Sequence, residues 1–174
     1  MKDLTVPIAL VLLAGCATVT PTKSSTATAD LKDAGGRSVG TATLSEVPGG
    51  VRIVMEVKGL PPGPKGVHIH EAGKCEGPQF TSAGGHFNPE KKEHGTLNPR
   101  GPHAGDLPNI TIAGDGNGRL ETTTNRVTLG SGATSVFDAD GSSLVIHAGP
   151  DDFLTDPTGN SGGRSACGVI VKKD

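Results

Sequence analysis

The chain has 174 residues, of which 33% are hydrophobic and 2% aromatic, and its formal net charge is −2. This length leaves room for one domain of ordinary size. The 27 glycines and 13 prolines argue against a helical bundle and favour an all-β domain with turn-rich connections. The weak net charge provides no basic surface for nucleic acid, so no nucleic-acid partner is expected. The low apolar content predicts a small core that a disulfide or a bound metal would stabilise.

The N-terminus has the features of an export signal. Lys2 precedes an apolar run over residues 6–13, which is too short to span a bilayer. The run ends in a Leu-Ala-Gly-Cys box at Cys16 that resembles the lipidation box of bacterial lipoproteins. We therefore expect residues 1–15 to be a lipoprotein signal peptide. The alternative is an ordinary secretory signal with an incidental cysteine.

Lipidation would attach the exported protein to a membrane through the acyl chains on Cys16. The expected location is the bacterial cell envelope, on the periplasmic side of a membrane or at the cell surface. Residues 16–26, rich in threonine and serine with one proline, then form a flexible tether. The folded domain is expected over residues 27–174.

Export determines how the other two cysteines are interpreted. With Cys16 lipidated, Cys75 and Cys167 remain as an even pair in an oxidising compartment. A bridge between them would remove roughly 4–5 kcal/mol of unfolded-state entropy on the loop-closure model. The alternative is a pair of buried free thiols.

The body of the chain is dominated by short segments with the alternation of β-strands. Residues 51–57 place Val51, Ile53, Met55 and Val57 on one face. Tight turns are expected at residues 48–50 and 115–118. Strands are predicted at residues 38–45, 51–57, 66–70, 108–113, 118–124, 143–147 and 166–172. Short strands separated by turns at regular intervals predict an antiparallel Greek-key barrel or immunoglobulin-like sandwich.

One connection is far longer than the usual loop. About 35 residues over 71–107 contain no convincing strand, which marks either disorder or function. The segment contains Cys75, three histidines and Asp106. Metal coordination and a disulfide would supply the order that secondary structure does not. We therefore expect a functional loop.

The chain has six histidines, and their positions suggest a metal centre: His68, His70, His86, His94, His103 and His147. Residues two apart on a strand point to one face, so His68 and His70 project together. A His-x-His motif alone more often consists of two exposed polar residues than of two metal ligands. A lone histidine that follows an apolar run, as His147 does, is also more often structural than a metal ligand. His94, His103 and Asp106 form a nitrogen-and-oxygen set that suits zinc, and His86 lies between the two groups in sequence.

Together these residues resemble the copper/zinc superoxide dismutases, over nearly all of the chain from residue 27 to residue 172. The resemblance implies one copper and one zinc per subunit. Copper would be held by His68, His70, His86 and His147. Zinc would be held by His86, His94, His103 and Asp106. The intervals from His86 to the other zinc ligands, 8, 17 and 20 residues, match the family's zinc loop.

The resemblance also assigns supporting residues. Asp151 would join the two metal sites by hydrogen bonds to His70 and His94. Arg164 would supply the charge beside copper, and Thr158 would lie at the channel mouth. Cys75 and Cys167 match the family's disulfide.

The family's activity converts two superoxide anions and two protons to O₂ and H₂O₂ by copper redox cycling, with His86 carrying one proton. In an exported protein it would act as an antioxidant that protects the envelope from extracytoplasmic superoxide. The alternative is a non-catalytic copper- or zinc-binding protein, a store or chaperone, on the same fold.

The loop over residues 151–158 is shorter than in animal cytosolic enzymes and lacks their guiding lysine and glutamates. It resembles the exported bacterial branch. This difference leaves both a monomer and a homodimer open.

Overall fold

The computed structural model describes residues 25–173. The expected signal peptide over residues 1–15, the lipidation site Cys16 and nearly all of the tether lie outside the described residues. Within residues 25–173, no helix is long and apolar enough to cross a bilayer.

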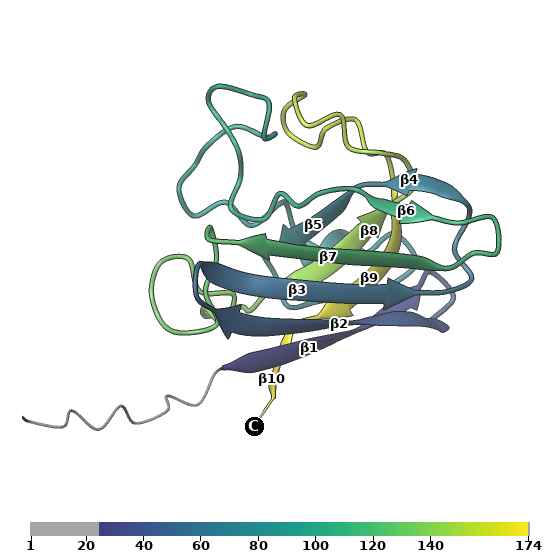
Figure 1. The fold of residues 1–174 in the computed structure, drawn as a ribbon, viewed down its shortest axis with the longest axis horizontal. Coiled ribbons are helices and arrows are strands. Elements are labelled where there is room, and N and C mark those ends of the chain that lie inside the picture. Colours follow the sequence, from purple (N-terminus) through teal and green to yellow (C-terminus); the bar gives the residue numbers. More distant parts are fainter. Residues whose placement is uncertain (1–24, 174) are drawn as a thin grey trace, which may run out of the picture.

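The described chain is built from ten strands in a single antiparallel sheet (Figure 1). The strands are β1 (Thr26–Asp33), β2 (Ser38–Val47), β3 (Gly50–Val57), β4 (Gly63–Lys65), β5 (Val67–His70), β6 (Ile110–Ile112), β7 (Gly118–Thr124), β8 (Ser143–His147), β9 (Arg164–Val169) and β10 (Val171–Lys173). Their order is β4-β6-β7-β3-β2-β1-β9-β8-β5, and β10 pairs with β1. Only Gly66 separates the two end strands in sequence, so the sheet curls into a nearly closed barrel. The predicted all-β antiparallel architecture is confirmed.

Burial alternates along the strands because successive side chains point to opposite faces. In β3, Val51, Ile53, Met55 and Val57 are buried, as the sequence pattern predicts. The turn expected at residues 48–50 joins β2 to β3, which pair from Val47 opposite Gly50 onward. These inward side chains form one continuous core inside the barrel.

The strand boundaries differ from expectation at several places. Strand β1 was not predicted, because its buried residues Ala27 and Ala29 are small and alternate with polar residues. Residues 63–65 form β4 against β6, where only a turn leading into β5 was expected. The final segment divides into β9 and β10 at Ile170, whose N–H donates to the Ser142 carbonyl instead of continuing either strand.

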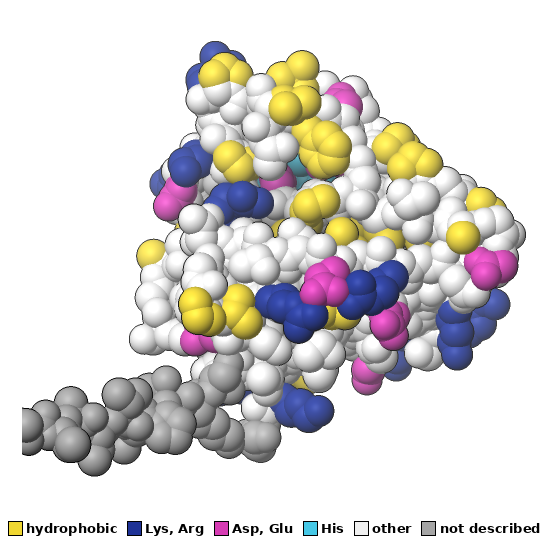
Figure 2. Space-filling model, viewed as in Figure 1, with side chains coloured by type: hydrophobic (Ala, Val, Ile, Leu, Met, Phe, Trp, Pro, Cys, Tyr) yellow, Lys and Arg dark blue, Asp and Glu magenta, His cyan; other side chains and the backbone are white. Residues whose placement is uncertain are grey.

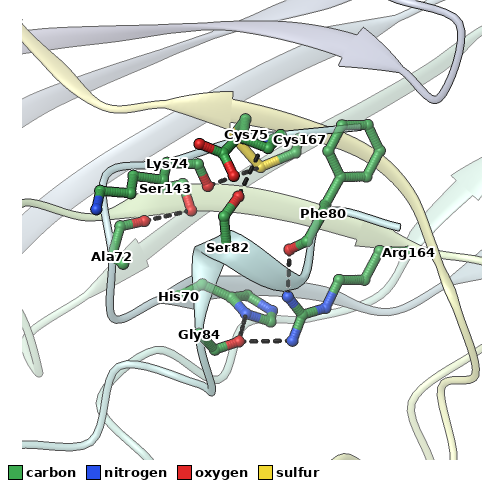
Figure 3. Close-up of a disulfide and its surroundings, with 11 residues drawn as sticks. His70, Ala72, Lys74, Cys75, Phe80, Ser82, Gly84, Ser143, Arg164 and Cys167 are labelled. Atoms are coloured by element: carbon green, nitrogen blue, oxygen red, sulfur yellow. Dashed lines mark hydrogen bonds between the residues drawn. A yellow bond between two sulfur atoms is a disulfide. The ribbon is translucent and has the colours of Figure 1, made fainter. Parts of the chain in front are cut away.

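The long connection contains no strand from residue 71 to residue 107 and only one short 3-10 turn, Thr81–Ala83. Its first part is joined to β9 by the Cys75–Cys167 disulfide, with Cα atoms 5.6 Å apart (Figure 3). Phe80 and Ala83 pack there against Val145 and Cys167 in a small second cluster outside the main core. The disulfide predicted from the cysteine count is confirmed.

We expect the paired change Cys75→Ser and Cys167→Ser to lower the free energy of unfolding by roughly 2–5 kcal/mol, because the bridge closes a long loop. Denaturant unfolding of the metal-free protein measures this loss. Hydrogen exchange should rise in residues 71–84, which have few other apolar contacts. Unchanged exchange in this segment would show that the bridge does not order it. Zinc should restore part of the lost stability through linkage.

Candidate metal centre

The site is built on β5, an end strand of the sheet. One edge of β5 pairs with β8, and its other edge receives the long connection. Single bridges there place His86 opposite His70 and Asp106 opposite His68. Because β5 carries two histidines and accepts loop residues along its free edge, side chains distant in sequence meet above one strand.

Gly105 permits the close approach of the loop to β5. The Ile69 N–H donates to the Gly105 carbonyl at 2.9 Å. A Cβ at this position would lie 2.2 Å from the Ile69 carbonyl oxygen. Glycine is therefore required one residue before Asp106, and the tight contact positions that carboxylate.

Four imidazoles converge in a first group, with ligand atoms within 4.8 Å of one another: His68, His70, His86 and His147. Each is buried, with at most 7% of its surface exposed. In each ring one nitrogen has a partner on the protein. The partners are Asp151 for His68, the Gly84 carbonyl for His70, Asp106 for His86 and the Gly162 carbonyl for His147.

The second nitrogen of each of these rings is buried without a hydrogen-bond partner. These atoms are His68 Nδ1, His70 Nε2, His86 Nε2 and His147 Nε2. Buried polar atoms are normally satisfied, so four unsatisfied nitrogens converging in one place require a ligand. Imidazole nitrogens suit copper, and the partners on the far side fix each ring's tautomer. The residues therefore fit a copper ion.

A second group surrounds Asp106 Oδ1. His86 Nδ1 and His94 Nδ1 each lie 3.0 Å from this oxygen, and His103 Nδ1 lies 3.4 Å from it. The set of ligand atoms within 4.8 Å of one another contains His68 in place of His103. We favour His103, because the unpartnered His68 Nδ1 belongs to the copper group. Three imidazoles and one carboxylate fit the four ligands of zinc.

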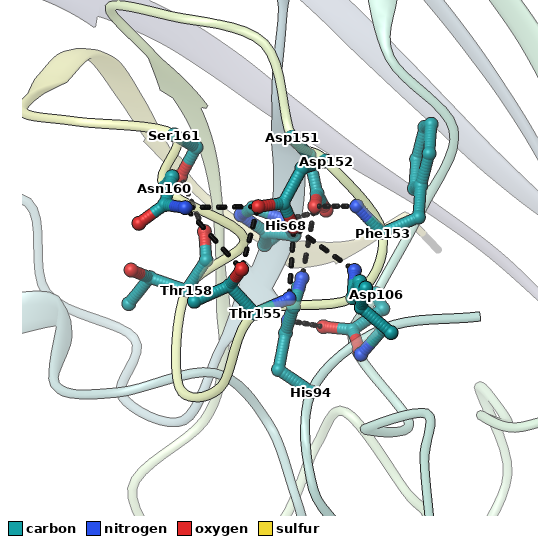
Figure 4. Close-up of polar contacts among 12 residues, drawn as sticks. His68, His94, Asp106, Asp151, Asp152, Phe153, Thr155, Thr158, Asn160 and Ser161 are labelled. Atoms are coloured by element: carbon teal, nitrogen blue, oxygen red, sulfur yellow. Dashed lines mark hydrogen bonds and ion pairs between the residues drawn. The ribbon is translucent and has the colours of Figure 1, made fainter. Parts of the chain in front are cut away.

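Asp151 links the two groups from the loop after β8 (Figure 4). Its carboxylate is 2.8 Å from His68 Nε2 and 2.9 Å from His94 Nε2, and the residue is 3% exposed. The expected bond to His70 is wrong, since His70 Nδ1 instead faces the Gly84 carbonyl. Asp151 lies beside the first histidine of the His-x-His pair because that ring directs Nε2 away from the other copper ligands.

Gly159 leaves room for this bridge. A Cβ at Gly159, whose φ is +61°, would lie 1.8 Å from Asp151 Oδ1 and 2.6 Å from His94 Nε2. No larger residue is compatible with the observed contact.

The sequence did not identify two further residues that hold the loops. Asn109 binds the backbone of Asp151 reciprocally, donating to its carbonyl and accepting from its N–H. Asp156 Oδ1 accepts the His94 N–H at 2.6 Å and lies 3.7 Å from His103 Nε2. Both residue types are common in turns, so only the fold reveals these roles.

Arg164 lies opposite His147 in the β8–β9 register. Its guanidinium donates to the carbonyls of Phe80 and Gly84, each at 2.5 Å (Figure 3). The same Gly84 carbonyl accepts from His70, so the arginine and a predicted copper ligand share one backbone atom. Thr158 is exposed, and its carbonyl accepts two hydrogen bonds from Ser161. Its role at a channel mouth stays a prediction.

Burial sets the charge of the imidazoles. It lowers the pKa of His68 to about 3 and that of His147 to about 4, so both rings are neutral at pH 7 and present lone pairs. Burial opposes protonation of His94 as well. The carboxylates of Asp106 and Asp151 outweigh it there and raise the pKa of His94 to about 9.

Comparisons with known proteins agree with this geometry. The family model described as copper/zinc superoxide dismutase matches residues 38–170. "Superoxide dismutase [Cu-Zn] 1" of Aquifex aeolicus is 51% identical over 82% of this chain and 85% of its own length. "Superoxide dismutase [Cu-Zn]" of Caulobacter vibrioides is 46% identical over 83% of this chain and 84% of its own.

Among solved structures, a superoxide dismutase-like protein from Bacillus subtilis matches with a TM-score of 0.80 and 43% identity. The match covers 83% of this chain and 96% of that one. That structure is of a double mutant in which a tyrosine and a proline were replaced by histidine. The present chain has its six histidines in its own sequence.

We expect Asp151→Asn to weaken zinc binding by about 10- to 100-fold. A carboxylate accepts from both imidazole N–H groups, whereas an amide has a single acceptor oxygen and must turn its NH₂ toward one ring. Competition with a chelator measures the affinity.

Asp152→Asn is the matched control, since Asp152 is exposed and, within residues 25–173, its carboxylate accepts hydrogen bonds from the loop residues Leu154, Thr155 and Asn160. Equal losses of zinc affinity in the two variants would assign the effect to the loop instead of the bridge.

Proposed function

Because this chain belongs to the copper/zinc superoxide dismutase family, we propose that it removes superoxide at the bacterial cell envelope. Its reaction converts two superoxide anions and two protons to O₂ and H₂O₂. The observation that carries the proposal is the convergence of four unpartnered imidazole nitrogens beside Arg164, which pairs across the sheet with His147.

Copper, when bound by His68, His70, His86 and His147, supplies a metal that accepts one electron from a first superoxide and gives it to a second. The protein's contribution is positional. Asp151 and the carbonyls of Gly84 and Gly162 fix three of these rings from the side away from the metal. His94, His103 and Asp106, with His86, would hold zinc, which does not change oxidation state and keeps the loop in place.

His86 has a distinct place between the two groups. Its Nδ1 faces Asp106, and its Nε2 faces the other three histidines. We propose that Nε2 also carries a proton to the peroxide product. Arg164 supports docking of superoxide, because a guanidinium held by two carbonyls presents a fixed positive charge to a small anion.

A non-catalytic metal-binding role on the same fold is the second candidate. One relative, the superoxide dismutase-like protein YojM of Bacillus subtilis, is 43% identical over 78% of this chain. The complete set of six histidines and Arg164 favours catalysis here, since storage needs ligands but no anion-docking charge.

The location of the enzyme is proposed from the sequence. The apolar run before Cys16 supports cleavage and lipidation at that cysteine, which would hold the domain on the periplasmic side of a membrane or at the cell surface. Monomer and homodimer are both compatible with this arrangement.

We expect Arg164→Glu to reduce the superoxide removal rate by about tenfold or more, because it replaces attraction by repulsion at the docking position. Arg164→Lys should reduce the superoxide removal rate much less, since lysine keeps the positive charge. Pulse radiolysis at low ionic strength measures both, with copper and zinc content checked for each. Lys58→Glu, at an exposed lysine, controls for the change in net charge. A glutamate variant as active as the wild type would remove Arg164 from the reaction.

Cys16→Ser should release the protein from membranes into the soluble extracytoplasmic fraction, because no acyl chain can be attached. Fractionation with labelled palmitate checks both the location and the lipid. Membrane-bound label on the serine variant would contradict lipidation at Cys16, and dismutase activity of the released domain should be unchanged.

A further inference from the structure

A cavity of about 280 Å³ lies beside the predicted zinc ligand Asp106, and none of the four histidines of the copper group lines it. The zinc loop contributes Asp106 and Leu107, and the loop after β8 contributes Phe153. Thr122 and Thr123 come from the end of β7, and Arg126 follows that strand. The cavity is therefore separate from the place where superoxide would react. On the face shown in Figure 2, apolar and charged side chains border a small hollow in which an acidic side chain and a histidine are visible.

Arg126 makes no ion pair with a carboxylate among residues 25–173. The chain has six arginines within residues 25–173. Four of them, Arg37, Arg52, Arg100 and Arg119, pair with carboxylates. In the described part of the chain, Arg126 and Arg164 have no such ion pair. Arg164 is the residue proposed to dock superoxide. The cavity therefore contains the other guanidinium that makes no ion pair with a carboxylate in the described residues.

The contacts of Arg126 leave most of its donors unused. Its Nη2 donates to the Asp106 carbonyl, and its Nε is buried with no partner among the described residues. A half-buried cation without a paired anion is costly. The Asp106 carboxylate attracts the guanidinium but makes no ion pair with it in the described part of the chain. Its Oδ2 accepts from the N–H groups of Gly95 and His103, and its Oδ1 faces three imidazoles.

The rest of the lining suits an organic anion. Thr122, on the same face of β7 as the buried Thr124, brings a hydroxyl-bearing side chain to the lining, and Leu107, Pro108 and Phe153 bring apolar surface. A guanidinium presents a planar fork that matches a carboxylate. We propose that this cavity binds a small carboxylate that carries an apolar group, with Arg126 as its anchor.

Benzoate is the probe, because it combines a carboxylate with a flat apolar ring. The reduced metal-loaded protein is diamagnetic, so backbone amide shifts in NMR report where benzoate binds. We expect saturable shifts at Thr122, Thr123 and Phe153 in the millimolar range, with acetate binding more weakly because it lacks the ring. No saturable shift at these residues would overturn the proposal, as would shifts confined to the surroundings of Arg164. Equal affinity for acetate would overturn the apolar part of it.

Arg126→Gln should weaken benzoate binding by about tenfold or more, because it removes the charge-assisted hydrogen bonds. Arg119→Gln is the matched control on β7, since Arg119 is exposed and already paired with Glu121, and it should leave the affinity unchanged. Unchanged binding in Arg126→Gln would refute the anchor.

Arg126 also holds the Asp106 carbonyl, so zinc content is measured for each variant. If the glutamine variant loses zinc, Arg126→Lys decides the question. Lysine retains the charge, and the proposal requires benzoate affinity between those of the wild type and the glutamine variant. If either variant loses zinc but binds benzoate with full affinity, Arg126 supports the zinc site through its contact with Asp106 and does not bind the carboxylate. That result would refute the proposal.

Discussion

The buried carboxylate of Asp151 is the contact on which the site depends. It accepts a hydrogen bond from His68 on β5 and from His94 in the zinc loop, so one side chain orients a ring of each metal group. Both rings then direct Nδ1 toward their metal positions. Asn109 fixes the Asp151 backbone, and Gly159 leaves space for the contact. The two loops are thereby coupled, and a disturbance on the zinc side reaches a copper ligand through one carboxylate.

Barrel closure explains why the site lies where it does. Strand β5 ends the sheet path and offers an open edge, which the zinc loop covers through single bridges at His68 and His70. The edge is protected, and the loop gains order without forming a strand. The Cys75–Cys167 disulfide and Arg164 hold the start of the same loop. Rigidity of a long irregular segment thus comes from a covalent bond, buried imidazoles and one guanidinium, which compensates for a core with few aromatic residues.

Much of this could be predicted from the sequence. Strands with large β-branched residues, such as β3, follow from alternation. The metal ligands were assigned through the resemblance to the family, whose zinc loop has the same intervals from His86 to the other zinc ligands. Strand β1 was missed because alanines alternating with polar residues give a weak signal. The partner of Asp151 was assigned to the wrong ring of His-x-His, since spacing places both rings on one face and says nothing of which nitrogen points where. The contacts of Asn109, Asp156 and Arg126 depend on tertiary approach and have no local signature.

We propose that the buried histidines form a copper site that reacts with superoxide and a separate zinc site that holds the loop. Elemental analysis combined with superoxide decay kinetics on the purified exported protein tests this most directly. We predict one copper and one zinc per chain, loss of activity when copper alone is removed, and its return when copper is added back with zinc still in place. A protein that retains both metals yet accelerates superoxide decay no more than its copper-free form would contradict the account.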